Sequence, residues 1–167
     1  MKKTIALILF AVLLLSAAGC GNASTAPAES TSAAVVEEGE PIPLDTVLTE
    51  ILDTVELPDM MKLTIDDLMD FFGLESAWYK DAAACVNANG YEKEEVILVH
   101  AASAQDVQSI TECLQTSLKN AATEMQNYLP EQYAMIQKCS VQSKGLYVWL
   151  FISDANDQMQ AILDKYL

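Results

Sequence analysis

The sequence predicts an α+β domain in which two N-terminal helices precede a ββαββα order, with helices packed on a four-stranded, mainly antiparallel sheet. Three observations support this fold class. The apolar runs at residues 96–99 and 146–152 do not alternate with polar residues, as expected for central strands covered on both faces. A glycine-containing turn signal precedes each run, at residues 89–90 and 144–145. A helix-capping signal and apolar residues at helical spacing follow each run.

The two N-terminal helices are predicted over residues 44–56 and 65–72. The first has apolar residues at positions 44, 47, 48, 51, 52 and 55, which places them on one helix face, and Pro58 ends it. The second begins with a capping box of Thr64 and Asp67 and ends at Gly73.

The first ββα unit is predicted from strands at residues 77–87 and 94–101 and a long helix at 104–128. Ser103 and Asp106 have the spacing of a capping box at the start of this helix. Pro130 suits the start of a short helix at residues 131–136.

The second ββα unit is predicted from strands at residues 138–143 and 146–153, with a final helix that starts at Asp154 and is capped through Asp157. The two units form a weak internal repeat, in which residues 96–110 correspond to residues 149–162. We therefore expect the long helix and the C-terminal helix to cover one face of the sheet.

The first 19 residues have the pattern of an export signal. Lys2 and Lys3 precede an apolar core of about a dozen residues, which is short for a membrane span of about 20 residues. The segment AAGC at residues 17–20 resembles the lipobox of bacterial lipoproteins, although leucine is commoner than Ala17 at its position. This resemblance implies cleavage before Cys20 and attachment of lipid to its sulfur, which would anchor the chain on the extracytoplasmic face of the cell membrane.

Residues 20–43 are predicted to form a flexible tether between the lipidated Cys20 and a single domain at residues 44–167. The segment is rich in Ala, Ser, Thr, Pro and Glu and contains no lysine. Such a composition buries too little apolar surface to offset the entropy of ordering.

The charge balance excludes a nucleic-acid-binding protein. Removal of residues 1–19 would leave seven lysines against 24 acidic residues, a formal charge of −17, and the chain contains no arginine. Binding to phosphates requires the opposite balance, and a bidentate arginine site cannot form within one chain.

The candidate interaction residues are Tyr147, Trp149 and Phe151, which alternate along the last predicted strand and therefore share one face. If exposed, this stripe could stack on sugars or receive a peptide. If covered by helices, it is part of the core, and the apolar character of both faces of the strand favours the core.

No catalytic, cofactor-binding or metal-binding pattern stands out. His100 is the only histidine, so a catalytic pairing would require Cys85, Cys113 or Cys139. These cysteines have no metal-ligand spacing, and a disulfide between two of them remains open. The acidic segment at residues 154–157 lacks the glycine and glutamate of a calcium loop. We expect no cofactor, and we read the acidic pairs at residues 66–67 and 94–95 as surface residues.

Several segments resemble the bacterial lipoproteins of domain-of-unknown-function family 4358. The matching stretches lie at residues 57–60, 63–73, 95–99, 128–133 and 141–148. The most specific part is the segment YLPEQY followed by the strand beginning GLYV. Membership implies export, lipid anchoring and one small domain, and it implies no catalytic residues.

These observations favour a membrane-anchored extracytoplasmic lipoprotein that is not an enzyme but a binding or accessory module of the cell envelope. Its partners would be the membrane, through the lipid on Cys20, and an envelope protein. The alternative is a small envelope-acting hydrolase in which His100 or several acidic residues converge in a cleft.

Overall fold

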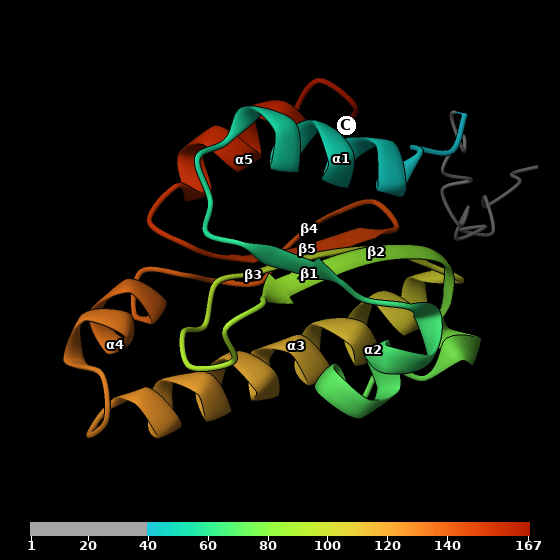
Figure 1. Cartoon of the computed structure of the whole chain (residues 1–167). Helices are drawn as coiled ribbons and strands as arrows, with labels where there is room; N and C mark the ends of the chain where they lie inside the picture. The colour runs from blue at the N-terminus through green and yellow to red at the C-terminus, as the bar shows by residue number, and fades with distance from the viewer. Residues whose placement is uncertain (1–39) are drawn as a thin grey trace, which may run out of the picture. The chain divides into compact units, whose positions relative to one another are not determined.

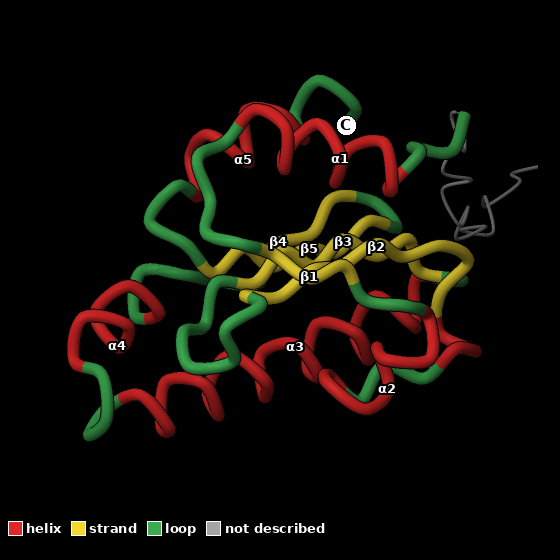
Figure 2. Tube along the Cα trace, viewed as in Figure 1, coloured by secondary structure: helices red, strands yellow, loops and turns green. Residues whose placement is uncertain are grey.

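The computed structural model describes residues 40–167, which form a five-stranded antiparallel sheet between two layers of helices (Figures 1 and 2). The export signal, Cys20 and most of the predicted tether lie outside the described residues. The elements, in chain order, are α1 (Leu44–Thr54), β1 (Met60–Lys62), α2 (Ile65–Phe72), a 3-10 turn (Ser76–Trp78), β2 (Tyr79–Asn87), β3 (Glu95–Ala101), α3 (Ala104–Met125), α4 (Pro130–Ile136), β4 (Gln142–Lys144), β5 (Tyr147–Ile152) and α5 (Asn156–Leu163). The mixed α+β class and the antiparallel sheet are therefore confirmed.

The sheet has five strands in the order β1-β2-β3-β5-β4, and the prediction of four strands is wrong. The additional strand is β1, in which Met60, Met61 and Lys62 pair with the end of β2. This strand has only three residues and no apolar alternation, so pairing with the long β2, rather than its own sequence, accounts for it.

The two faces of the sheet carry two separate apolar clusters, because successive side chains of a strand point to opposite sides. In β3, Val96 and Leu98 face α1 and α5, whereas Ile97 and Val99 face α2, α3 and α4. Figure 1 shows α1 and α5 on one side of the sheet and the other three helices on the opposite side.

The expectation that the long helix and the C-terminal helix cover the same face is wrong. Ile110 and Leu114 of α3 belong to one cluster, and Met159 and Leu163 of α5 belong to the other. A sheet whose central strands are apolar on both sides needs helices on both sides. Since α2, α3 and α4 occupy one face, α5 joins α1 on the other.

Local signals set the helix ends in most places. Thr64 and Asp67 form the predicted capping box of α2, and Gly73 ends the helix in the left-handed conformation (φ 70°). The Ser103 side chain accepts a hydrogen bond from the Asp106 N–H at the start of α3.

The predicted start of the last helix is wrong, since α5 begins at Asn156 without a side-chain cap. Asp154 instead forms an ion pair with Lys138 (3.1 Å), and the Ser153 hydroxyl accepts a hydrogen bond from the Ala155 N–H. The residue expected to cap the helix is therefore held by an ion pair outside it.

Candidate functional site

The predicted interaction stripe lies beneath helices. Trp149 and Phe151 are buried in the cluster under α1 and α5, and Tyr147 packs against its edge. The Trp149 indole N–H donates to Gln160 Oε1 of α5 (2.8 Å), and the Tyr147 hydroxyl accepts from the Ile42 N–H (3.0 Å). The sequence left open whether this stripe is an exposed surface or part of the core, and in the structure it is part of the core.

His100 lies on the same sheet face as this stripe, where its ring stacks on Tyr147 with centroids 4.4 Å apart. Cys85 pairs with Val96, four residues along β3 from His100, which corresponds to about 13 Å. Cys113 belongs to the opposite face of the sheet. The structure therefore does not bring His100 together with either of these thiols.

Cys85, Cys113 and Cys139 are all free thiols. Burial raises the pKa of Cys85 to about 11, and burial followed by the charge of Glu75 also raises the pKa of Cys113. Nucleophilic cysteines need a lowered pKa, so these two thiols have the properties of structural residues.

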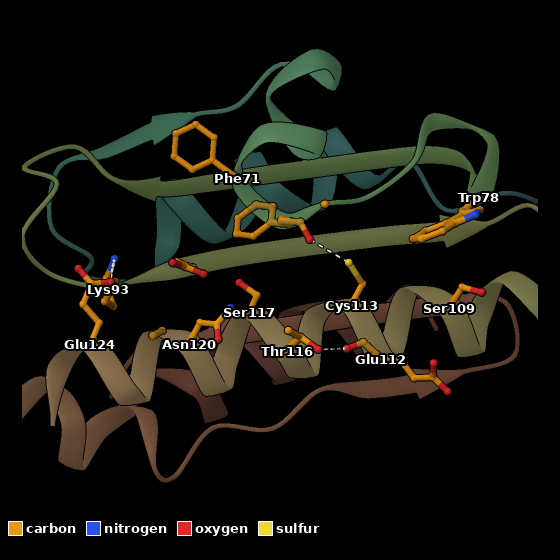
Figure 3. A pocket seen from close by; sticks show the side chains of 14 residues that line it. Phe71, Trp78, Lys93, Ser109, Glu112, Cys113, Thr116, Ser117, Asn120 and Glu124 are labelled. Atoms are coloured by element: carbon orange, nitrogen blue, oxygen red, sulfur yellow. Dashed lines mark hydrogen bonds and ion pairs between the residues drawn. The ribbon is translucent and has the colours of Figure 1, made fainter.

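A groove of about 730 Å³ opens between α2 and α3, on the sheet face opposite α1 and α5. We call it the α2–α3 groove. In Figure 3, α3 forms its floor, Phe71 lies on the opposite wall, Trp78 lies at one end, and Lys93 with Glu124 lies at the other. The α3 residues that line it are Ser109, Glu112, Cys113, Thr116, Ser117, Asn120, Ala121 and Glu124.

The α2 wall is fixed by contacts at both ends of that helix. The capping box holds its first turn, and the Cys113 thiol donates to the Phe72 carbonyl at its last turn (2.9 Å; Figure 3). A Cβ atom on Gly73 would lie 3.4 Å from the Cys113 sulfur. This close approach holds α2 against α3 at one point, and beside it Phe71 is half-exposed.

Side-chain hydrogen bonds hold the loop between β2 and β3 at the end of the groove. Glu94 accepts from Asn87 (2.7 Å) and from Gln132 of α4 (3.1 Å). The same Gln132 accepts from the Lys93 N–H (2.8 Å). The Lys93 ammonium then reaches α3, where it forms an ion pair with Glu124 (2.9 Å).

Glu95, the first residue of β3, is the most unusual group in the groove. Its Oε2 atom is inaccessible to water and has no hydrogen-bond partner among the described residues. Burial raises its pKa to about 7, an effect that Lys93 reduces and Glu124 increases. A carboxyl group in this state exchanges a proton near neutral pH and can either donate or accept a hydrogen bond.

The prediction that Glu94 and Glu95 form one surface pair is wrong for Glu95, which is largely buried. The two side chains point to opposite sides of the strand, and Glu95 is in phase with Ile97 and Val99. An acidic residue on the apolar phase of a strand was the available signal. A second signal was the polar, small-residue face of α3 at helical spacing, which begins at Ser109 and reaches Glu124.

Within residues 40–167, no group of three or more histidine, cysteine or acidic residues is arranged to hold a metal ion. The helices of this region are also too short or too polar to cross a membrane.

Comparison with known proteins identifies the family. No curated protein and no solved structure matches the chain. The family model described as "Domain of unknown function (DUF4358)" matches residues 53–153, which include the α2–α3 groove, all five strands and most of the core. The chain belongs to the DUF4358 family.

Proposed function

We propose that the protein is a lipid-anchored extracytoplasmic lipoprotein whose domain acts as a binding module of the cell envelope. The sequence pattern of residues 1–20 supports the anchor, and the predicted tether lets the domain work close to the membrane surface. The α2–α3 groove is the binding site, and an envelope component is its ligand. The acidic charge of the chain argues against nucleic acid.

The observation that carries the binding role is the Glu95 carboxyl group, which lines an open groove and has one buried oxygen, Oε2, without a hydrogen-bond partner. Binding sites are concave and combine apolar walls with a few convergent polar groups. Phe71 and Trp78 supply the apolar wall, and Ser117 and Asn120 supply polar groups on α3. Glu95 lines the groove although its Oε2 atom is closed off from water, so a ligand of complementary charge in the groove would stabilise the carboxylate by charge rather than by a bond to Oε2.

The anchor is tested by labelling cells with palmitate and separating membranes from soluble protein. We expect label in the wild-type protein and loss of both label and cleavage in Cys20→Ala. A Cys20→Ala protein that is processed and stays at the membrane, or a wild-type protein without label, would contradict the anchor.

The binding site is tested with a photo-crosslinking amino acid placed at Asn120 in the groove. The matched control places it at Gln115, which is exposed on the same helix but does not line the groove. We expect an adduct in cells from position 120 and not from position 115. Equal labelling from both positions, or none from either, would contradict a ligand in the groove.

A hydrolytic role is the second candidate, because one observation favours it. Glu95 has the raised pKa of a general acid, and Glu112 and Glu124 supply further carboxyl groups in the same groove. The test is the release of soluble fragments from isolated cell-envelope material. A hydrolase requires release by the wild-type protein and its loss in Glu95→Gln, whereas a binding module releases nothing.

A further inference from the structure

We propose that the α2–α3 groove binds a ligand carrying a primary ammonium group on an apolar chain, with the Glu95 carboxylate as its counter-ion. This inference rests on the binding role proposed above and names the chemistry of the ligand. It follows from the charges in the groove, the position of Glu95 and the aromatic wall.

The charges in the groove favour a cation. Three carboxyl groups line it, from Glu95, Glu112 and Glu124, against one ammonium group, from Lys93. Lys93 is already paired with Glu124 at 2.9 Å, so an anionic ligand would meet Glu95 and Glu112 without a free counter-charge in the lining. An ammonium ligand supplies the missing positive charge and three hydrogen-bond donors.

The position of Glu95 makes it the natural counter-ion. Its register partners in the neighbouring strands are Val86 and Ile152, which offer its side chain no polar side chain. Oε2 is closed off from water, while the residue as a whole lines the groove. Lys93 is the one positive charge that lowers the pKa of Glu95 against the effect of burial, and a ligand ammonium in the groove would add a second favourable charge.

The wall opposite α3 suits the apolar part of such a ligand. Phe71 is 51% exposed although it is a large apolar side chain, and Trp78 is partly buried at the other end of the groove (Figure 3). Aromatic faces bind methylene groups and are attracted to ammonium groups. The groove therefore presents an apolar side and an acceptor-rich side, in the arrangement that an alkylammonium chain requires.

The charge state of Glu95 makes the binding pH-dependent. The charged groups that act on it are Lys93 from its own loop and Glu124 from α3, and the further titratable groups in the groove lining are Glu112 and Cys113 of α3. In the groove lining α2 contributes aromatic rings, and the residues paired with Glu95 in the neighbouring strands are aliphatic. Since the pKa of Glu95 is about 7, the carboxylate dominates at pH 8 and the neutral acid at pH 6. A primary amine stays protonated at both values, so its affinity should rise about tenfold from pH 6 to pH 8.

The experiment compares hexylamine, hexanol and hexanoate, which share an apolar chain and differ in charge. The purified full chain is labelled with 15N at its two tryptophans, and the indole N–H signals are followed by NMR. Trp78 lines the groove, whereas Trp149 lies on the other sheet face and serves as an internal control. We expect hexylamine to shift the Trp78 signal selectively, with a dissociation constant about tenfold lower at pH 8 than at pH 6.

Variants separate the proposed counter-ion from general charge effects. Glu95→Gln should weaken hexylamine binding at pH 8 by about tenfold and abolish the pH dependence. Glu56→Gln makes the same charge change at an exposed site outside the groove, and it should leave the affinity for hexylamine and its pH dependence unchanged. If Glu95→Gln does not fold, the pH dependence of the wild-type protein remains a complete test.

Binding of hexanol or hexanoate as tightly as hexylamine would overturn the ammonium inference while leaving the groove a binding site. Hexylamine binding that is independent of pH or unchanged in Glu95→Gln would also overturn it. Failure of the proposed binding role itself would appear separately, as the absence of a position-specific adduct from Asn120.

Discussion

On the two sides of the sheet, the pKa of a glutamate is shifted in opposite directions. On the face covered by α1 and α5, which we call the closed face, Glu50 of α1 accepts hydrogen bonds from Lys165 (2.6 Å) and Tyr166 (2.7 Å). These bonds lower the pKa of Glu50. On the groove face, Glu95 has an unpartnered oxygen, and burial raises its pKa to about 7. The first carboxylate ties α1 to the residues that follow α5, and the second is the one that we propose as the counter-ion of a ligand.

The difference follows from the helices that cover each face. The stripe on α1 is apolar along its length, so its residues Val47, Leu48 and Ile51 are buried in one cluster with residues of the sheet and α5. The side of α3 that faces α2 carries hydroxyl, amide and carboxyl groups from Ser109 to Glu124. Such groups stay at the surface rather than in a closed core, and the groove remains open between the two helices.

The largest expected effect is on the free energy of unfolding, and it distinguishes the face covered by α1 and α5 from the groove. Leu48→Ala removes a fully buried side chain from the closed face and should lower the free energy of unfolding by about 3 kcal/mol. Asn120→Ala, in the groove, should change it by less than about 0.5 kcal/mol. Urea unfolding of both variants measures this contrast, which would fail if Asn120→Ala were as destabilising as Leu48→Ala.

The next effect concerns the pH dependence of stability. The pKa of Glu95 rises from 4.5 to about 7 on folding, so the folded chain keeps a proton that the unfolded chain loses between these values. The contribution of Glu95 to the free energy of unfolding is therefore fully present below pH 4.5. This contribution, about 3 kcal/mol, is lost as pH rises through 7.

Glu95→Gln removes this loss. The stability difference between Glu95→Gln and the wild-type protein should thus move in favour of the variant by about 3 kcal/mol between pH 4 and pH 8. Urea unfolding at several pH values measures it, and Glu56→Gln is the control. A difference that does not vary with pH would show that Glu95 titrates normally in the folded protein.

A smaller effect is expected at the α2 wall. Thr64→Ala removes the side-chain cap of α2 and should cost about 1 kcal/mol, with faster amide exchange in Ile65–Phe72. The hydrogen bonds from Thr64 lower the pKa of Asp67, so this pKa should return toward its ordinary value in the variant. Thr64→Ser keeps the hydroxyl and should behave like the wild type; equal effects of both variants would argue against the cap.

The smallest effect on stability is expected from the ion pair of Lys93 and Glu124 at the end of the groove. Changes at this pair also test how the groove sets the pKa of Glu95. Lys93→Gln and Glu124→Gln each break an ion pair that is partly exposed, which should cost less than about 1 kcal/mol. The pKa of Glu95 should move in opposite directions, upward in Lys93→Gln and downward in Glu124→Gln, because the two charges act on it with opposite sign. Carbon NMR of the Glu95 carboxyl group measures both shifts, and shifts of the same sign would contradict this electrostatic picture.

The parts of the fold that local chemistry controls could be predicted from the sequence. The α2 boundaries follow from Thr64, Asp67 and Gly73, since a cap and a left-handed glycine act within one helical turn. The central strands β3 and β5 follow from apolar runs that require cover on both sides. The presence of α4 after Pro130 follows from the fixed φ of proline.

The candidate site could not be predicted in the same way. Apart from Lys93, most residues that line the groove with Glu95 come from α2 and α3, which are separate segments of the chain. The raised pKa of Glu95 depends on burial, which only the packing of those helices creates. The stripe of Tyr147, Trp149 and Phe151 shows the same limit, because its sequence fits both an exposed surface and a core.

The sequence by itself determined the α+β class, the main helices and strands, the family and the acidic character of the chain, because capping, periodicity and composition act locally or on the whole chain. Only the tertiary structure decided that α5 joins α1, that β1 extends the sheet, and that Glu95 lies in a groove without a partner for Oε2. These features depend on which surfaces meet across long sequence separations, and no local pattern specifies such contacts.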